Sequence, residues 1–372
     1  MDALTTPSNW QRVRLGDIGK PCMCKRVMKH QTTRYGEIPF YKIGTFGNTA
    51  DAFISKKLFL EYQTKYSFPK KGDILISASG TIGRAVIYDG KPAYFQDSNI
   101  VWIDNDETLV KNDFLFYAYS NVKWNTEHTT ILRLYNDNFR NTLIPLPPLN
   151  EQSAIADILS DVDHYLCSLD ALILKKESVK KALSFELLSQ RKRLKGFNQA
   201  WQRVRLGDIC EITTGSLDAN EMVHYGKYRF YTCAKEYYFI DKYAFDTEAI
   251  LISGNGAYVG YVHYYKGKFN AYQRTYVLDN FSEHIIFIKY FLTIFLQSHI
   301  QTNRNEGNTP YIVMATLKDF EIPLPSLNEQ IAIADILSAL DKEIANLKNK
   351  KRQFENIKKA LNHDLMSAKI RV

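Results

Sequence analysis

The nine residues Trp-Gln-Arg-Val-Arg-Leu-Gly-Asp-Ile at Trp10–Ile18 return without change at Trp201–Ile209. A second stretch is also repeated: Leu149–Gln152 followed by Ala154–Ser160 returns, in the same order, between Leu327 and Ser338. Two matching landmarks in the same order indicate that the chain is one module written twice. Each module consists of a variable globular part, a proline-rich hinge and a long helix.

The spacing of the landmarks sets the domain organisation. Trp10 and Trp201 are 191 residues apart, whereas Leu149 and Leu327 are 178 apart, so the second globular part is 13 residues shorter than the first. A chain of 372 residues has room for two or three such domains. We expect globular domains over 1–149 and 196–327, and long helices over 150–195 and 328–372.

The hinge predicts where each helix begins. Proline lacks the amide donor and favours an extended residue before it, so Ile144–Pro148 and Ile322–Ser326 cannot lie inside a helix. Asn150 and Asn328 are suited to cap the helices that follow, each with a glutamate next to the positive helix end. About forty helical residues then correspond to a rod of about 60 Å.

Both helices carry apolar residues at steps of three and four over several heptads, which is typical of a coiled-coil seam. Two such ladders in one chain most simply pair with each other in an antiparallel arrangement that holds two globular domains at a fixed distance. The predicted seam residues are Ile155, Leu159, Val162, Leu166, Leu169, Ile333, Leu337, Leu340, Ile344 and Leu347.

The globular parts contain strands that enter and leave a glycine turn. Ile74–Ser77 and Ala85–Tyr88 are such a pair in the first copy, and Ile250–Ser253 and Tyr261–Tyr264 in the second. A helical apolar stretch follows each pair, near Phe114–Tyr119 and Ile285–Leu296. Since the strands pair through short turns, we expect two mixed α/β domains of the α+β class rather than a parallel α/β fold.

Catalytic and metal-binding motifs are not evident. Gly254, Gly256 and Gly260 follow a strand, but the next residues are strand formers, so a hairpin turn is favoured over a phosphate-binding loop. The five cysteines show no zinc spacing, and Met1–Asn9 does not resemble a signal peptide. The sequence therefore predicts a soluble, cytoplasmic, non-catalytic protein without a metal site or a membrane-spanning segment.

Polar loops offer a different kind of chemistry. The 48 Lys and Arg residues exceed the 40 Asp and Glu residues, which is compatible with a polyanionic partner but also common in ordinary proteins. Arginine, asparagine and glutamine can read base edges, whereas lysine mainly holds phosphate. The scaffold matches between copies while these loops differ, so two domains could bind two different short sequences. The candidate DNA-binding residues are Lys25, Arg26, Lys29, Arg34, Ser79, Thr81, Arg84, Gln96, Asn99, Arg133 and Asn136 in the first copy, and Lys227, Asn255, Tyr258, Gln273, Arg274, Asn303, Arg304 and Asn308 in the second.

On these features the chain resembles the specificity subunit of type I restriction–modification systems. The resemblance covers essentially the whole chain and rests on the two Trp-x-x-x-Arg-Leu-Gly-Asp-Ile openings, the Ile-Ser-x-x-Gly turns, and Ile-Pro-Leu-Pro-x-Leu-Asn-Glu-Gln before each helix. It implies two target-recognition domains separated by two antiparallel helices, with pseudo-twofold symmetry. It does not carry over individual base-reading residues, because the loops match only by position.

The resemblance also implies partners. Double-stranded DNA would be bound at two half-sites around a spacer, and two modification (methyltransferase) subunits, with restriction subunits, would join the chain. The chain itself would hold no cofactor, since S-adenosylmethionine binds to the modification subunits, and ATP and Mg to the restriction subunits. Two alternatives remain open at this point: a modification-only or phase-variable methyltransferase system, and a coiled-coil scaffold adaptor without sequence preference.

Overall fold

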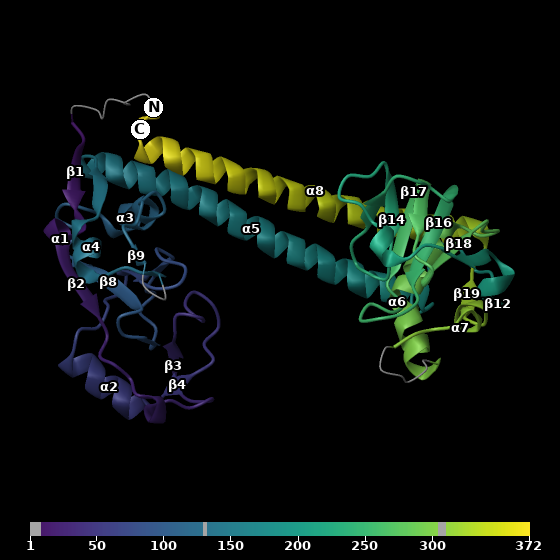
Figure 1. Ribbon diagram of the computed structural model, residues 1–372, viewed down its shortest axis with the longest axis horizontal. Helices are drawn as coiled ribbons and strands as arrows, with labels where there is room; N and C mark the ends of the chain where they lie inside the picture. Colours follow the sequence, from purple (N-terminus) through teal and green to yellow (C-terminus); the bar gives the residue numbers. More distant parts are fainter. Residues whose placement is uncertain (1–8, 129–131, 304–309) are drawn as a thin grey trace. The chain divides into compact units, whose positions relative to one another are not determined.

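The computed structural model describes residues 9–128, 132–303 and 310–372 (Figure 1). The chain divides into two compact units, one made of Met1–Asp170 with Lys350–Val372 and the other of Ala171–Asn349. Each unit therefore contains one globular domain together with a segment of both long helices, α5 (Leu149–Leu188) and α8 (Leu327–Met366). The two helices are 40 residues each, as the estimate of about forty residues predicts, but they end at Leu188 and Met366, before the expected ends at 195 and 372.

The first unit is built on a four-stranded antiparallel sheet in the order β2-β8-β5-β6, beside a three-stranded sheet in the order β4-β3-β7. Its elements are β1 (Gln11–Arg14), α1 (Leu15–Ile18), β2 (Gly19–Met23), η1 (Lys29–Gln31), β3 (Ile38–Tyr41), β4 (Phe53–Ile54), α2 (Lys56–Lys65), β5 (Ile74–Ser77), β6 (Ala85–Ile87), β7 (Tyr94–Phe95), β8 (Ile100–Asn105), α3 (Asn112–Tyr119), β9 (Glu127–His128), β10 (Leu132–Arg133), α4 (Asn136–Asn141) and β11 (Leu143–Leu146).

The strand β5 separates two apolar cores. Side chains alternate across a strand, so Ile74 and Ile76 pack against α3 and the adjoining ends of the long helices, whereas Leu75 faces the core that contains Phe46 and Trp102. All five of these side chains are at most 2% exposed. The glycine turn that follows β5 is thereby held over a sheet buried on both faces.

The second unit has one six-stranded sheet in the order β13-β18-β16-β17-β14-β15. Its elements are β12 (Gln202–Arg205), η2 (Leu206–Asp208), β13 (Glu211–Thr214), η3 (Ala219–Glu221), β14 (Tyr228–Tyr231), β15 (Tyr238–Ile240), β16 (Phe245–Ser253), β17 (Val262–Ala271), β18 (Thr275–Asp279), α6 (Ile285–Asn303), α7 (Met314–Lys318) and β19 (Glu321–Leu324).

The sheets of the two units differ for a local reason. β17 pairs antiparallel with β16 and also parallel with β14, so one long strand joins both parts of the sheet. In the first unit two separate strands make these pairings: β6 pairs antiparallel with β5, and β7 pairs parallel with β3. A turn that contains Gly90, with φ of +84°, and Pro92 separates β6 from β7. Both units are mixed α/β domains with antiparallel hairpins at the glycine turn, as the sequence predicts.

The long helices run antiparallel within each unit. In the first unit Asp163 and Asp170 of α5 pair with Lys358 and Lys351 of α8, so the later residue of α5 meets the earlier residue of α8. In the second unit Lys180 pairs with Asp341 in the same sense. None of the ten predicted seam residues is exposed. Ile155, Leu159, Ile333 and Leu337, however, pack into the cores of the globular domains.

The proline hinge is a β-strand. β11 pairs antiparallel with β1, and β19 with β12, so Pro145 lies opposite Arg12, and Pro323 opposite Arg203. The prediction that Asn150 and Asn328 cap the helices is wrong by at least one residue. α5 and α8 already begin at the preceding leucines, because the carbonyls of Pro148 and Ser326 accept the first intrahelical bonds.

The glutamates at the helix starts bind the module openings. Glu151 accepts 2.9 Å hydrogen bonds from the Asn9 amide and the Trp10 indole. Glu329 is fully buried and accepts from the Trp201 indole at 3.2 Å and from Arg193 at 2.7 Å. In each module the repeated tryptophan therefore donates a hydrogen bond to the repeated glutamate, and this bond joins the globular domain to its helix.

Candidate nucleic-acid interface

In both units, equivalent backbone hydrogen bonds join three loops, and we call this arrangement the loop frame. In the first unit the Ala78 amide donates to the Asn99 carbonyl at 2.7 Å, and the Leu134 amide donates to the Ala78 carbonyl at 2.8 Å. In the second unit Gly254 donates to Arg274 at 2.8 Å, and Ile312 donates to Gly254 at 2.9 Å. The segment after the glycine-turn strand is thus the centre of three loops in each domain.

This frame puts three positions of one unit in correspondence with three of the other. Isolated bridges join Ser79 to Arg133 and Asn255 to Tyr311. With the contacts above, Ser79, Asn99 and Arg133 correspond to Asn255, Arg274 and Tyr311. The backbone positions match while every side chain differs.

The side chains of the first set contact one another. The Ser79 hydroxyl donates to the Asn99 side-chain oxygen at 2.8 Å, and Arg133 donates to the same oxygen at 3.3 Å. A pocket of about 470 Å³ opens beside them. Its polar lining includes Arg26, Lys29, Lys42, Gln96, Asn99 and Arg133. The structure therefore brings together five of the predicted residues, from three separate loops, with one further lysine.

Charge in this pocket is partly neutralised. Arg26 pairs with Asp97 at 2.7 Å, and Lys42 pairs with Asp51 at 2.8 Å. Gln96 is held inward, because its side-chain oxygen accepts a 2.9 Å bond from the Ile43 amide. It shapes the loop and has one amide group left for a ligand.

Other predicted residues of the first copy lie outside this pocket. Lys25 lies over the Tyr66 ring at 5.1 Å. The Arg84 guanidinium donates a 3.0 Å hydrogen bond to the Phe46 carbonyl. The remaining three are exposed side chains on neighbouring segments: Arg34 on the loop after η1, Thr81 on the glycine turn, and Asn136 at the start of α4.

In the second unit Gln273 and Arg274 form part of the turn between β17 and β18, and Asn255 lies next to it. Gln273 and Arg274 are exposed there, and the Gln273 amide donates to the Leu217 carbonyl at 2.9 Å. Asn255 is half-buried. Tyr258 is 43% exposed and lies under the Lys235 ammonium at 5.2 Å.

Three predicted residues of the second copy are not described as side chains. Asn303 ends α6, but its side chain, like Arg304 and Asn308, lies outside the described residues. Lys227 is exposed just before β14, away from the frame contacts.

Sequence reasoning missed several polar residues at these faces. Lys42, Lys235 and Tyr311 lie in loops whose sequences do not match between the two modules, so only the folded structure identifies them. Arg229 was also missed. It lies between the rings of Tyr237 and Tyr265, at 4.2 and 4.5 Å. Burial alone would lower the pKa of Arg229, but the hydrogen bond to Tyr231 and the electrostatic interactions with Tyr231, Tyr237 and Tyr265 together outweigh it, and the pKa is raised.

Neither metal-ligand clusters nor spanning helices are found in the described ranges. Within 9–128, 132–303 and 310–372 no three His, Cys, Asp or Glu residues are grouped so that they could hold a metal ion. In the same ranges no helix is both long and apolar enough to cross a membrane.

The protein has two mixed α/β domains and a pair of long helices. The two domains have the same loop frame but different polar side chains, and this combination defines a duplicated recognition protein. Residues 7–176 and 198–356 match the family described as type I restriction modification DNA specificity domain, and the chain belongs to this family.

Relatives agree with this assignment. A Haemophilus influenzae protein assigned as a type I restriction enzyme specificity subunit is 63% identical over 148 residues, 40% of this chain and 38% of that one. The EcoDI specificity subunit of Escherichia coli is 40% identical over 43% of this chain and 35% of its own length. The chain thus spans little more than a third of these two relatives. The MjaVIII specificity subunit of Methanocaldococcus jannaschii is 27% identical and is covered to 95%, with all of this chain aligned.

Solved structures share the fold. The S subunit of the type I restriction-modification system of M. genitalium has a TM-score of 0.64 at 18% identity. The comparison covers 98% of this chain and 99% of that one. This likeness supports the duplicated α+β architecture inferred from the repeat.

Proposed function

We propose that this chain is the DNA-recognition subunit of a type I restriction–modification complex, and that it reads a bipartite double-stranded target. One observation carries the proposal. The matching loop frame of the two units contains Ser79, Asn99 and Arg133 in one domain, with Ser79 buried, but Asn255, Arg274 and Tyr311 in the other. Two domains with one frame and unlike hydrogen-bonding groups suit two different half-sites, since base edges are distinguished by donor and acceptor patterns.

The lysines and arginines around each frame suit the DNA backbone. Lys29 and Lys42 line the first pocket, and Lys235 lies over the ring of Tyr258 in the second unit. Phosphate contacts provide affinity and orientation without reading sequence. In this proposal the cations hold the duplex while asparagine, glutamine and arginine select bases, and the chain works where the DNA is, in the cytoplasm.

The chain supplies recognition and no chemistry of its own. S-adenosylmethionine would be held by two modification subunits, and ATP with Mg by restriction subunits. Exposed residues that are identical in both modules suggest where two copies of one partner dock. Leu149 and Leu327, 42% and 50% exposed, begin the two long helices with identical exposed asparagines next to them. Exposed positions further along differ, for example Cys167 and Ala345.

The decisive experiment is methylation of random-sequence duplexes by this chain co-expressed with a modification subunit. We expect one split motif with a fixed gap. Arg133→Ala should relax only one half-site and Arg274→Ala only the other, each by about 1–3 kcal/mol of discrimination. Lys56→Ala, an exposed residue of α2 outside the pocket, is the matched control.

Two other results would redirect the proposal. A continuous motif, or methyl transfer by the isolated chain, would contradict a two-domain recognition subunit. Salt-dependent DNA affinity without any sequence preference would support a coiled-coil adaptor instead, because phosphate contacts are blind to sequence. A split motif in cells that lack a restriction subunit would assign the chain to a modification-only or phase-variable system.

A further inference from the structure

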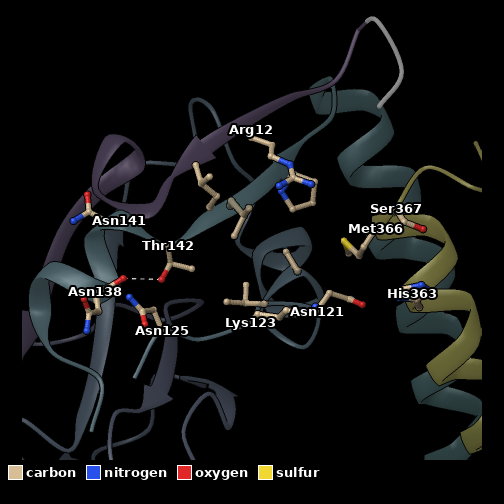
Figure 2. A pocket seen from close by; sticks show the side chains of 15 residues that line it. Arg12, Asn121, Lys123, Asn125, Asn138, Asn141, Thr142, His363, Met366 and Ser367 are labelled. Carbon is tan, nitrogen blue, oxygen red and sulfur yellow. Dashed lines mark hydrogen bonds between the residues drawn. The ribbon is translucent and has the colours of Figure 1, made fainter. Parts of the chain in front are cut away.

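A polar cavity of about 670 Å³ lies in the first unit, and its lining residues are not those of the loop frame (Figure 2). Figure 2 shows Arg12 of β1 on one side of it, Asn121 and Lys123 from the segment after α3 on another, and His363 of α8 on a third. Its remaining polar lining is Asn125, Asn138, Asn141, Thr142 and Ser367, and none of the described residues that line it carries a carboxylate. Side chains from four separate segments thus present donors to one space.

The second module shows that this cavity is not a by-product of the repeated scaffold. Arg203 is the repeat of Arg12, and it pairs with Glu321 of the neighbouring strand at 3.2 Å. The next arginine, Arg205, lies 3.8 Å from Asp319. The corresponding positions in the first module are Leu143 and Asn141, both neutral. Within the described residues, Arg12 has no ion-pair partner.

The floor of the cavity also differs between the modules. Tyr117 of α3 and Tyr290 of α6 occupy equivalent places, because each donates to an aspartate of the long helices. α3 ends two residues later, whereas α6 continues to Asn303. Lys123 therefore lies in the irregular segment after α3, whereas Leu296, the same number of residues after Tyr290, is still helical and fully buried.

The side of the cavity formed by α8 is also more polar than its counterpart in the second module. His363 corresponds to Phe185 of the other long helix, whose ring packs against Phe295 of α6 at 5.8 Å. One module therefore closes this place with aromatic packing and acid–base pairs. The other leaves it open and lines it with Arg12, Lys123, His363 and amides.

We propose that this cavity binds a phosphate group, carried by a free nucleotide or by a nucleic-acid backbone. Phosphate oxygens only accept hydrogen bonds, and arginine, lysine, an imidazole N–H and amide N–H groups all donate. The volume falls within the range of small-molecule pockets. Val122, Leu143 and Met366 also line it and provide apolar contact for a sugar or base. The site is independent of the two half-site readers.

Two fluorescent probes test the proposal on the full chain: an ATP analogue, and a short duplex of arbitrary sequence. The variant is Arg12→Gln with Lys123→Gln, and the matched control is Arg203→Gln at the repeated position. A second variant, His363→Phe, introduces the residue of the closed module. We expect at least a tenfold loss of affinity in both cavity variants and less than a twofold change in the control.

The probes separate the two sources of phosphate. Binding of the ATP analogue that inorganic phosphate displaces indicates a nucleotide site, whereas an effect confined to the duplex indicates a backbone contact. The proposal is overturned if neither probe binds the unaltered chain, or if the variants and the control bind both probes equally well. Because the assay needs no modification subunit, its failure is distinguishable from failure to methylate a split motif.

Discussion

The phenol of Tyr290 donates a 2.6 Å hydrogen bond to the carboxylate of Asp341, and Lys180 reaches the same carboxylate from the other long helix. Tyr117, Asp163 and Lys358 repeat this arrangement in the first unit, with a phenol–carboxylate distance of 2.9 Å. The helices exchange roles, since the aspartate lies in α5 in one unit and in α8 in the other. In each unit, one tyrosine–aspartate–lysine group thus links the globular domain to both long helices.

Removing the hydroxyl of Tyr290 should weaken the link between the globular domain and the long helices. We expect Tyr290→Phe to lower the free energy of unfolding by about 1–2 kcal/mol, because a hydrogen bond to a charged group is lost while the ring remains. Urea denaturation measures the change. Tyr225→Phe is the control, since Tyr225 is 97% exposed. Equal stability of the two variants would mean that the contact contributes nothing.

The same carboxylate predicts a pH dependence. Burial alone would raise the pKa of Asp341, but hydrogen bonds from Lys180 and Tyr290 outweigh it and hold the pKa below the ordinary 3.8. A carboxyl group with a lowered pKa stabilises the fold above its unfolded pKa, and this contribution is lost as the pH falls through the folded value. Asp341→Asn should therefore be less stable than the natural chain at pH 7.

The stability gap between the natural chain and Asp341→Asn should narrow as the pH falls below about 3.8. Urea midpoints at pH 7, 5 and 3 measure this gap. A gap that stays constant across the series would show that the amide fails for a steric reason and that the charge of Asp341 is unimportant.

The repeat made the scaffold predictable for a physical reason. Leu159 and Leu337 are both fully buried, and Trp10 and Trp201 both bind a helix glutamate, so packing restrains these positions in each copy. The antiparallel helices and the hairpin at the glycine turn follow from the same restraints.

The candidate sites were less predictable, because solvent-exposed loops carry no such restraint. Nothing in the sequence pairs Arg133 with Tyr311, and their correspondence rests on backbone hydrogen bonds alone. The cavity near Lys123 was equally hidden. It depends on how far a helix continues after Tyr117, and apolar periodicity locates the end of a helix poorly.

The glycine turn provides a prediction with a built-in control. Gly80 and Gly83 both have positive φ, +67° and +84°. A Cβ on Gly80 would meet nothing within 4 Å, whereas one on Gly83 would lie 2.1 Å from the indole nitrogen of Trp124. Gly80→Ala should cost about 1–2 kcal/mol for the left-handed backbone.

Gly83→Ala should cost at least about 1–3 kcal/mol more than Gly80→Ala, because the added methyl must displace Trp124. Thermal unfolding compares the two variants directly. If both lose the same stability, the tryptophan can move without penalty, and the turn is restrained by its backbone conformation alone.

Asp97 is the acidic residue closest to Arg26 in the first pocket, with a 2.7 Å contact between them. The aspartate side chain is only 15% exposed, while the arginine is 66% exposed. An arginine held by a carboxylate is less available to a phosphate, so we expect Asp97 to limit DNA binding that does not depend on sequence. Asp97→Asn should therefore tighten binding to duplexes that lack the target.

The salt dependence identifies the cause of this effect. One additional phosphate contact steepens the plot of log affinity against log salt by about 0.9, so the Asp97→Asn slope should differ from that of the natural chain by that amount. Asp89→Asn is the control, because its partner Lys91 forms an ion pair in the same unit outside the pocket. Tighter binding with an unchanged slope would mean that the substitution acts by reshaping the loop. A steeper slope would place Arg26 on the DNA backbone and leave base selection to Asn99 and Arg133.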